Sequence, residues 1–188
     1  MSKGINLAEN TSNIRTFSNN NKPVVFLSHK SEDKEFVEKI GEYIMNAGID
    51  IYLDKYDFNL QKATRENDYK KITECIQDGV SKCTHLLCII SNKTKKSWWV
   101  PYEIGYGKKA EKKIATLCKS DINSIEIPDY LKIESVIEKI EELNSFIKNI
   151  TVNNNISLNE KYYYFNENNN IIQSVSENKH FLDNYLKR

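Results

Sequence analysis

The stretch His85-Leu86-Leu87-Cys88-Ile89-Ile90 gives the strongest strand signal in the 188-residue chain. A short, unbroken apolar run is typical of a strand that is buried on both faces, as in a parallel sheet. The polar pair Ser91-Asn92 follows it directly. We therefore predict a central strand whose carboxyl end opens onto polar side chains.

Strand and helix patterns alternate on both sides of this run, which favours right-handed βαβ units and a parallel sheet. Before it, the pattern predicts a strand over 24–27, a helix from Ser31 to Gly48, a strand over 49–53, a long polar loop over 54–67 and a helix over 69–80. After it, the pattern predicts a helix over 102–112, a strand over 114–118, a short fifth strand over 125–127 and an amphipathic helix over 134–150.

These elements suggest one α/β domain over residues 23–150 with a segment at each end. The size suits a doubly wound, flavodoxin-like parallel sheet of five strands. Residues 1–22 are polar and Asn-rich, and we expect a flexible arm there. Residues 151–188 are expected to form a C-terminal extension, with a hairpin over 161–175 and a short helix over 177–186.

Composition excludes several classes of function. The formal net charge is +1, so we expect no nucleic-acid partner. No apolar run approaches the roughly 20 residues of a membrane span, and the N-terminus lacks the apolar core of a signal peptide. The four cysteines form no C-x-x-C pair and have no His at zinc-ligand spacing. We expect a reduced, cytoplasmic protein without a bound metal or cofactor.

A ligand site is expected at the carboxyl ends of the strands, where open parallel sheets bind their ligands. Those ends carry Ser28-His29-Lys30, Asp54 and Ser91-Asn92. The helix from Ser31 directs free N–H groups to the same edge, which favours an anion such as a pyrophosphate. If the segment after the central strand is helical, Trp99 and Glu103 lie one turn apart on one face. An indole beside a carboxylate suits a nucleotide ring and a ribose.

Taken together, these segments resemble the TIR (Toll/interleukin-1 receptor) domain family. The resemblance covers residues 23–148 and is carried by the order and spacing of 25–33, 48–54, Trp99-x-x-x-Glu103 and 127–131. It implies a flavodoxin-like fold and, as in many bacterial members, cleavage of NAD at the nicotinamide–ribose bond. The catalytic glutamate of the family falls on Glu103, and its preceding tryptophan falls on Trp99.

The resemblance also implies roles for neighbouring residues. Trp99 and Tyr102 would wall the site, and Ser28, His29 and Lys30 would contact the phosphates or the nicotinamide side. His29 suits a loop-structural role equally well, and Asp54 suits a loop cap as well as a substrate contact. Trp98 is expected to be structural. The polar segment 54–67 could close over the substrate or join one TIR domain to another.

Stand-alone bacterial members resemble the signal-making half of anti-phage systems such as Thoeris. We therefore expect NAD to be a substrate, and the product to be an ADP-ribose derivative, cyclic by preference, that reaches a separate effector. Water, adenine or a ribose hydroxyl could each capture the ribose, and the sequence does not choose among them. The alternative is a non-catalytic interaction module that acts through TIR–TIR assembly.

Overall fold

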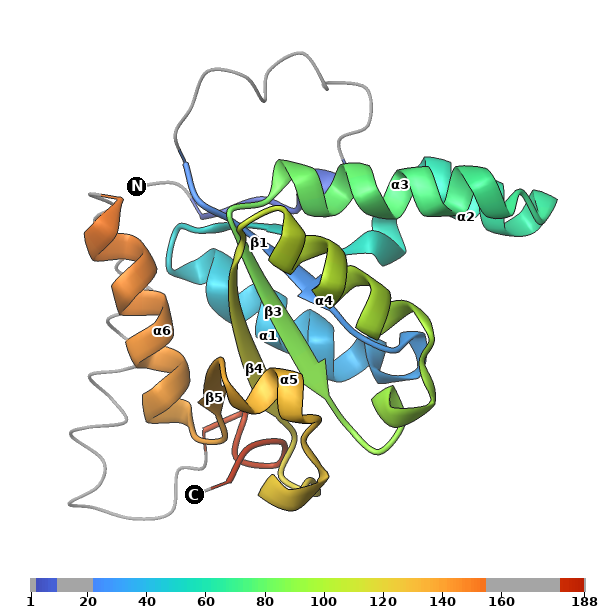
Figure 1. The fold of residues 1–188 in the computed structure, drawn as a ribbon. Helices are drawn as coiled ribbons and strands as arrows, with labels where there is room; N and C mark the ends of the chain where they lie inside the picture. The colour runs from blue at the N-terminus through green and yellow to red at the C-terminus, as the bar shows by residue number, and fades with distance from the viewer. Residues whose placement is uncertain (1–2, 10–21, 155–179, 188) are drawn as a thin grey trace, which may run out of the picture.

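Five parallel strands form the centre of the molecule in a computed structural model that describes residues 3–9, 22–154 and 180–187 (Figure 1). The strands are β1 (Val24–Ser28), β2 (Asp50–Tyr52), β3 (His85–Ile90), β4 (Lys113–Cys118) and β5 (Ser135–Ile137). They lie in the order β2-β1-β3-β4-β5. β3 pairs with both β1 and β4 and is buried along its whole length. The predicted flavodoxin-like sheet is confirmed.

Helices cover both faces of this sheet, as Figure 1 shows. They are α1 (Lys34–Asn46), α2 (Phe58–Glu66), α3 (Tyr69–Lys82), α4 (Trp99–Lys109), α5 (Asp129–Lys132) and α6 (Ile140–Asn153). Apolar residues of α1 and α6 form one core with the sheet, and those of α3, α4 and α5 form the other. α1 ends where Gly48 adopts a positive φ of 86°, as its position in the sequence predicts. Within the described ranges, none of the helices combines the length and apolar character needed to cross a membrane.

The fifth strand lies later in the chain than predicted. Residues 124–126 form a 3₁₀ turn, in which Glu126 accepts a hydrogen bond from the backbone N–H of Asn123 at 2.9 Å. Ile125 is 90% exposed, so its apolar side chain is no sign of a buried strand. The edge strand is Ser135–Ile137 instead, and the last helix begins at Ile140 and not at residue 134.

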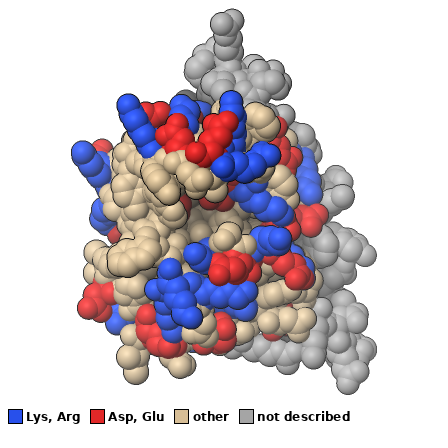
Figure 2. Space-filling view, turned by 90° about the vertical axis from the view of Figure 1, so that its right-hand side faces the viewer, with Lys and Arg blue, Asp and Glu red and all other residues tan. Residues whose placement is uncertain are grey.

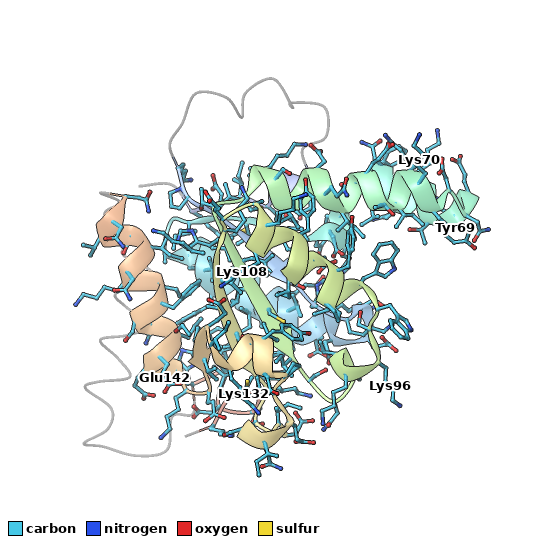
Figure 3. All side chains as sticks on the ribbon, viewed as in Figure 1. Tyr69, Lys70, Lys96, Lys108, Lys132 and Glu142 are labelled. Carbon is cyan, nitrogen blue, oxygen red and sulfur yellow. The ribbon has the colours of Figure 1, made fainter. Side chains whose placement is uncertain are left out.

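The prediction of a loop over residues 54–67 was wrong, because this segment contains helix α2. Asp57 caps this helix by accepting hydrogen bonds from the N–H groups of Asn59 at 2.8 Å and Leu60 at 3.1 Å. The buried hydroxyl of Tyr52 donates a hydrogen bond to the same carboxylate. Only Ala63 of α2 is buried, which explains why the sequence shows no apolar periodicity there. α2 packs beside α3, and the pair extends past the sheet to Tyr69 and Lys70 (Figure 3).

The described part of the expected N-terminal arm packs against the domain. The N–H of Ile5 donates to Asp50 Oδ1 at 2.9 Å, and its carbonyl accepts from the N–H of Ile51 at 3.0 Å. Leu7 and Ala8 are buried in the core on the α3–α4 side. Residues 3–9 therefore lie alongside β2 and are not a loose arm, while residues 1–2 and 10–21 lie outside the described residues.

The described end of the C-terminal extension also packs against the domain. Leu182 and Leu186 are buried in the core beside α1 and α6, and the N–H of Lys187 donates to the carbonyl of Glu138 at 2.8 Å. Residues 180–187 form turns instead of the predicted helix. Here the imidazole of His180 accepts from the N–H of Leu182 at 3.1 Å, a local bond that competes with helix formation. The predicted hairpin over 161–175 lies outside the described residues.

Candidate active site at the carboxyl edge of the sheet

A buried hydrogen bond joins the end of β1 to helix α4. Ser28 is the last residue of β1, and α4 contacts both β1 and β3. The hydroxyl of Ser28 donates to Glu103 Oε2 at 2.5 Å. Ser28 is fully buried and Glu103 is only 2% exposed. The sequence placed both residues at this edge, and the structure brings them into direct contact.

Burial controls the ionisation of Glu103. Loss of hydration raises the pKa of its carboxyl well above the usual 4.5, and the negative charge of Asp54 raises it further. The hydrogen bond from Ser28 acts in the opposite direction and is the weaker influence. The pKa of Asp54 is also raised, mainly by burial, while the neighbouring His29 lowers it. In this conformation, burial and the charge of Asp54 therefore oppose the ionisation of Glu103.

His29 and Asp54 form a second pair beside the first. The imidazole Nδ1 of His29 lies 2.9 Å from the carbonyl oxygen of Leu27, so Nδ1 carries the proton and donates it to that acceptor. Asp54 Oδ1 lies 3.8 Å from the same nitrogen. His29 is buried, and the Asp54 side chain is 26% exposed. The backbone bond fixes the ring, so that its Nε2 is the nitrogen left for other partners.

A cavity of about 700 Å³ adjoins the second pair. Its size is within the usual range for small-molecule sites. It is lined by the strand-end residues His29 and Asp54, by residues at and before the start of α1, and by one face of α2: His29, Ser31, Glu32, Lys34, Asp54, Lys55, Leu60, Gln61, Thr64 and Arg65. Figure 2, which views the molecule from the right-hand side of Figure 1, shows a hollow with basic and acidic side chains above, below and to the right of it. Ser28 and Glu103 do not line the cavity, but Ser28 directly precedes His29, which does.

The aromatic residues of α4 have different surroundings. Trp99 is 40% exposed and meets the ring of Tyr102 edge-on, with 5.9 Å between the ring centroids. The Tyr102 hydroxyl accepts a hydrogen bond from Gln77 Nε2 of α3 at 2.6 Å. Tyr102 therefore ties α4 to α3 and supports Trp99. Trp98 is 92% exposed, so its expected structural role has no support in core packing.

Two other polar residues of this edge make local contacts. Lys30 Nζ lies 3.8 Å from Glu32 Oε2, and Lys30 does not line the cavity. Ser91 is buried and donates its hydroxyl proton to the buried carboxylate of Asp33. The hydroxyl of Ser91 at the end of β3 is therefore already used in an internal hydrogen bond. The strand ends that line the cavity are those of β1 and β2, through His29 and Asp54.

The sequence prediction missed the cavity wall that α2 provides. The residues of α2 that line the same cavity as the strand-end pair are Leu60, Gln61, Thr64 and Arg65. The available signal was an Asp cap followed by Leu60 and Ala63 three residues apart, which is a short helical pattern.

Three comparisons relate this chain to known proteins. A family model described as "TIR domain" matches residues 25–141. A curated protein of Bacillus cereus (strain MSX-D12), "Probable 3' cyclic ADP-D-ribose synthase ThsB'", is 27% identical over 93 residues, which are 50% of this chain and 47% of that protein. The chain thus spans about half the length of this relative. The structure of Clostridium botulinum CMP N-glycosidase, BcmB, matches with a TM-score of 0.45 and 18% identity, over 65% of this chain and 97% of that one.

Proposed function

The chain belongs to the TIR domain family, and on that premise we propose that it cleaves NAD between nicotinamide and ribose, with Glu103 as the catalytic carboxylate. The observation that carries the proposal is the buried Ser28–Glu103 pair at the strand edge, beside a cavity lined by His29 and Asp54. A carboxyl group held in a water-poor setting next to a ligand-sized cavity is typical of a reactive site.

The proposed chemistry breaks one C–N bond. The bond between ribose C1′ and the pyridinium nitrogen breaks, and its electron pair goes to nitrogen, so nicotinamide leaves as a neutral molecule. Positive charge then builds up on the ribose, and an ionised Glu103 stabilises it. Because the leaving group needs no proton, one carboxylate is enough for bond breaking.

The raised pKa of Glu103 fits this scheme. Burial and the charge of Asp54 raise the pKa of this carboxyl and so oppose its ionisation. A bound pyridinium ring brings a positive charge next to it and lowers its pKa. Substrate binding would thus generate the carboxylate that the reaction requires, at the place where the charge develops.

The surrounding residues support positioning roles in this proposal. Trp99 offers a partly exposed indole face for a planar ring, and Tyr102 of the same helix supports it through its hydrogen bond from Gln77 of α3. Asp54 and the Nε2 of His29 are suited to contact ribose hydroxyls or the carboxamide. Lys30 is paired with Glu32 and would have to leave that partner to reach a phosphate.

For the product, we propose an ADP-ribose derivative, with a cyclic isomer preferred. The printed name of the Bacillus cereus relative describes a cyclic ADP-ribose synthase, and it supports this choice by similarity alone. Capture of C1′ by a nitrogen or hydroxyl of the same molecule closes the ring and releases one proton. We further propose that this product signals to a separate effector in anti-phage defence, and that the protein works in the cytoplasm, where its four free cysteines would stay reduced.

The test is incubation of the purified full chain with NAD, followed by chromatography for nicotinamide and mass spectrometry of the second product. We expect nicotinamide from the wild type and none from Glu103→Gln, which keeps the size and the hydrogen-bonding partner of the side chain. An equal rate from both proteins would refute the role of Glu103. A linear ADP-ribose product would refute the cyclase assignment only.

One observation favours a second candidate, a non-catalytic module that acts through TIR–TIR assembly. Glu103 is 2% exposed, and a carboxyl that is closed off in this way has no path to a substrate unless the site opens. If concentrated protein, incubated with a cell extract from phage-infected bacteria, still releases no nicotinamide, this second candidate replaces the first.

A further inference from the structure

Two of the cations that line the 700 Å³ cavity form no ion pair within the described residues. They are Arg65, in the last turn of α2, and Lys34, the first residue of α1. Neither forms an ion pair with any residue in the ranges 3–9, 22–154 and 180–187. Arg65 is the only arginine in those ranges.

The other charged groups of the cavity already have partners. Lys55 is paired with Glu38, which also accepts a hydrogen bond from the hydroxyl of Tyr56. Glu32 is paired with Lys30 outside the cavity. Asp54 lies next to His29. Arg65 and Lys34 are therefore the cations of this cavity that have no ion-pair partner among the described residues, although the charge of Lys34 also acts on Glu38.

The position of Arg65 depends on the first turn of α2. Gln61 Nε2 donates a hydrogen bond to the carbonyl of Lys55, and Asp57 caps the helix. Arg65 follows Gln61 by one turn, so both lie on the same face, and Arg65 Nε donates to the Gln61 carbonyl at 3.3 Å. This bond uses one donor of the guanidinium and leaves the terminal nitrogens free to form a bidentate contact.

From these contacts we propose that Arg65 and Lys34 form a subsite for the diphosphate of a dinucleotide, in the cavity that His29 and Asp54 also line. The identification of that dinucleotide as NAD rests on the proposed function. The diphosphate carries two negative charges on neighbouring phosphorus atoms, so it can accept from a guanidinium fork and from an ammonium group together. With the diphosphate held there, the nicotinamide end of the substrate would extend toward the carboxyl edge of the sheet, where Glu103 contacts Ser28.

The test measures binding and does not depend on turnover. ADP-ribose, which has the diphosphate, and adenosine, which has none, are each titrated calorimetrically into the wild type, Arg65→Gln and Arg65→Lys. The matched control is Lys62→Gln on the same helix, since Lys62 is paired with Glu66 and does not line the cavity. Arg65 is exposed, so its loss leaves the core intact, and circular dichroism checks this.

We expect Arg65→Gln to weaken ADP-ribose binding by about tenfold or more, in line with the loss of a charged hydrogen bond. Arg65→Lys should recover part of this affinity, Lys62→Gln should match the wild type, and adenosine should bind all four proteins equally. Lys34→Gln added to Arg65→Gln should weaken ADP-ribose binding further. The subsite is refuted if the wild type fails to bind ADP-ribose, or if Arg65→Gln binds it as tightly as Lys62→Gln does.

The two proposals fail separately. If the wild type binds ADP-ribose through Arg65 but releases no nicotinamide from NAD, the subsite stands and the proposed activity is wrong. If NAD is cleaved with the same KM by the wild type and by Arg65→Gln, the activity stands and the subsite is wrong.

Discussion

Replacing Glu103 by glutamine should stabilise the fold at neutral pH while it removes activity. The folded protein holds the Glu103 proton to a higher pH than the unfolded chain does, since burial and Asp54 raise its pKa above the usual 4.5. The folded state therefore binds more protons than the unfolded state from about pH 4.5 up to the raised pKa. Within that window, the free energy of unfolding falls as the pH rises.

The size of this effect follows from linkage. A difference of one bound proton changes the free energy of unfolding by about 1.4 kcal/mol per pH unit. The glutamine side chain can still accept a hydrogen bond from Ser28 through its amide oxygen. Because it stays neutral at every pH, the pH dependence of the unfolding free energy that comes from Glu103 is absent in the variant. Wild type and variant should be similar in stability below about pH 4.5, and the variant should gain an advantage as the pH rises.

The assay is urea unfolding of both proteins at several pH values between about 4 and 8, with the difference in unfolding free energy plotted against pH. Asp54 is present in both proteins, so the difference reports the titration of Glu103 together with its electrostatic interaction with Asp54. Glu111→Gln is the control, because Glu111 is exposed just after the end of α4. Parallel curves for wild type and Glu103→Gln would refute the argument, and so would a variant that is the less stable one at pH 8.

Three further outcomes are expected. Leu186→Ala should lower the free energy of unfolding by about 2–5 kcal/mol in urea unfolding, because Leu186 is 2% exposed in the core; a change near zero would mean that the C-terminal segment is not packed in solution. Tyr52→Phe should cost about 1–3 kcal/mol in the same assay, because it leaves the buried Asp57 cap without its hydroxyl partner, and an unchanged stability would contradict that. Trp99→Ala should raise the KM for NAD more than it lowers kcat, since the indole is proposed to hold the substrate; a lower kcat at an unchanged KM would speak against this role.

The sequence predicted where the site lies in the fold, but it did not predict how deeply Glu103 is buried there. Ser28 and Glu103 could be placed at one edge, because parallel strands present their carboxyl ends together and α4 follows β3 directly. The near-complete burial of Glu103 depends on how α4 packs over β1 and β3, and no local pattern reports such tertiary packing.

The two elements that the sequence patterns failed to predict, α2 and β5, bury few of their side chains. α2 buries only Ala63, and β5 has three residues, of which only Ile137 is buried. Hydrophobic periodicity is the main sequence signal for such elements, and it fades when most of their side chains face water. The cavity wall that carries Arg65 was missed for that reason.

The terminal segments have a consequence for the edges of the sheet. A strand edge offers unpaired N–H and C=O groups, which can recruit a strand from another molecule and start aggregation. Residues 5 and 6 occupy the free side of β2 through the bonds between Ile5 and Ile51 and the bridge from Asn6 to Ile51. At the opposite end of the sheet, Lys187 forms a similar bridge to Lys139, just beyond β5. Trimming either end of the chain, as is common when an expression vector is designed, would therefore uncover a site where a second copy could add its own strand.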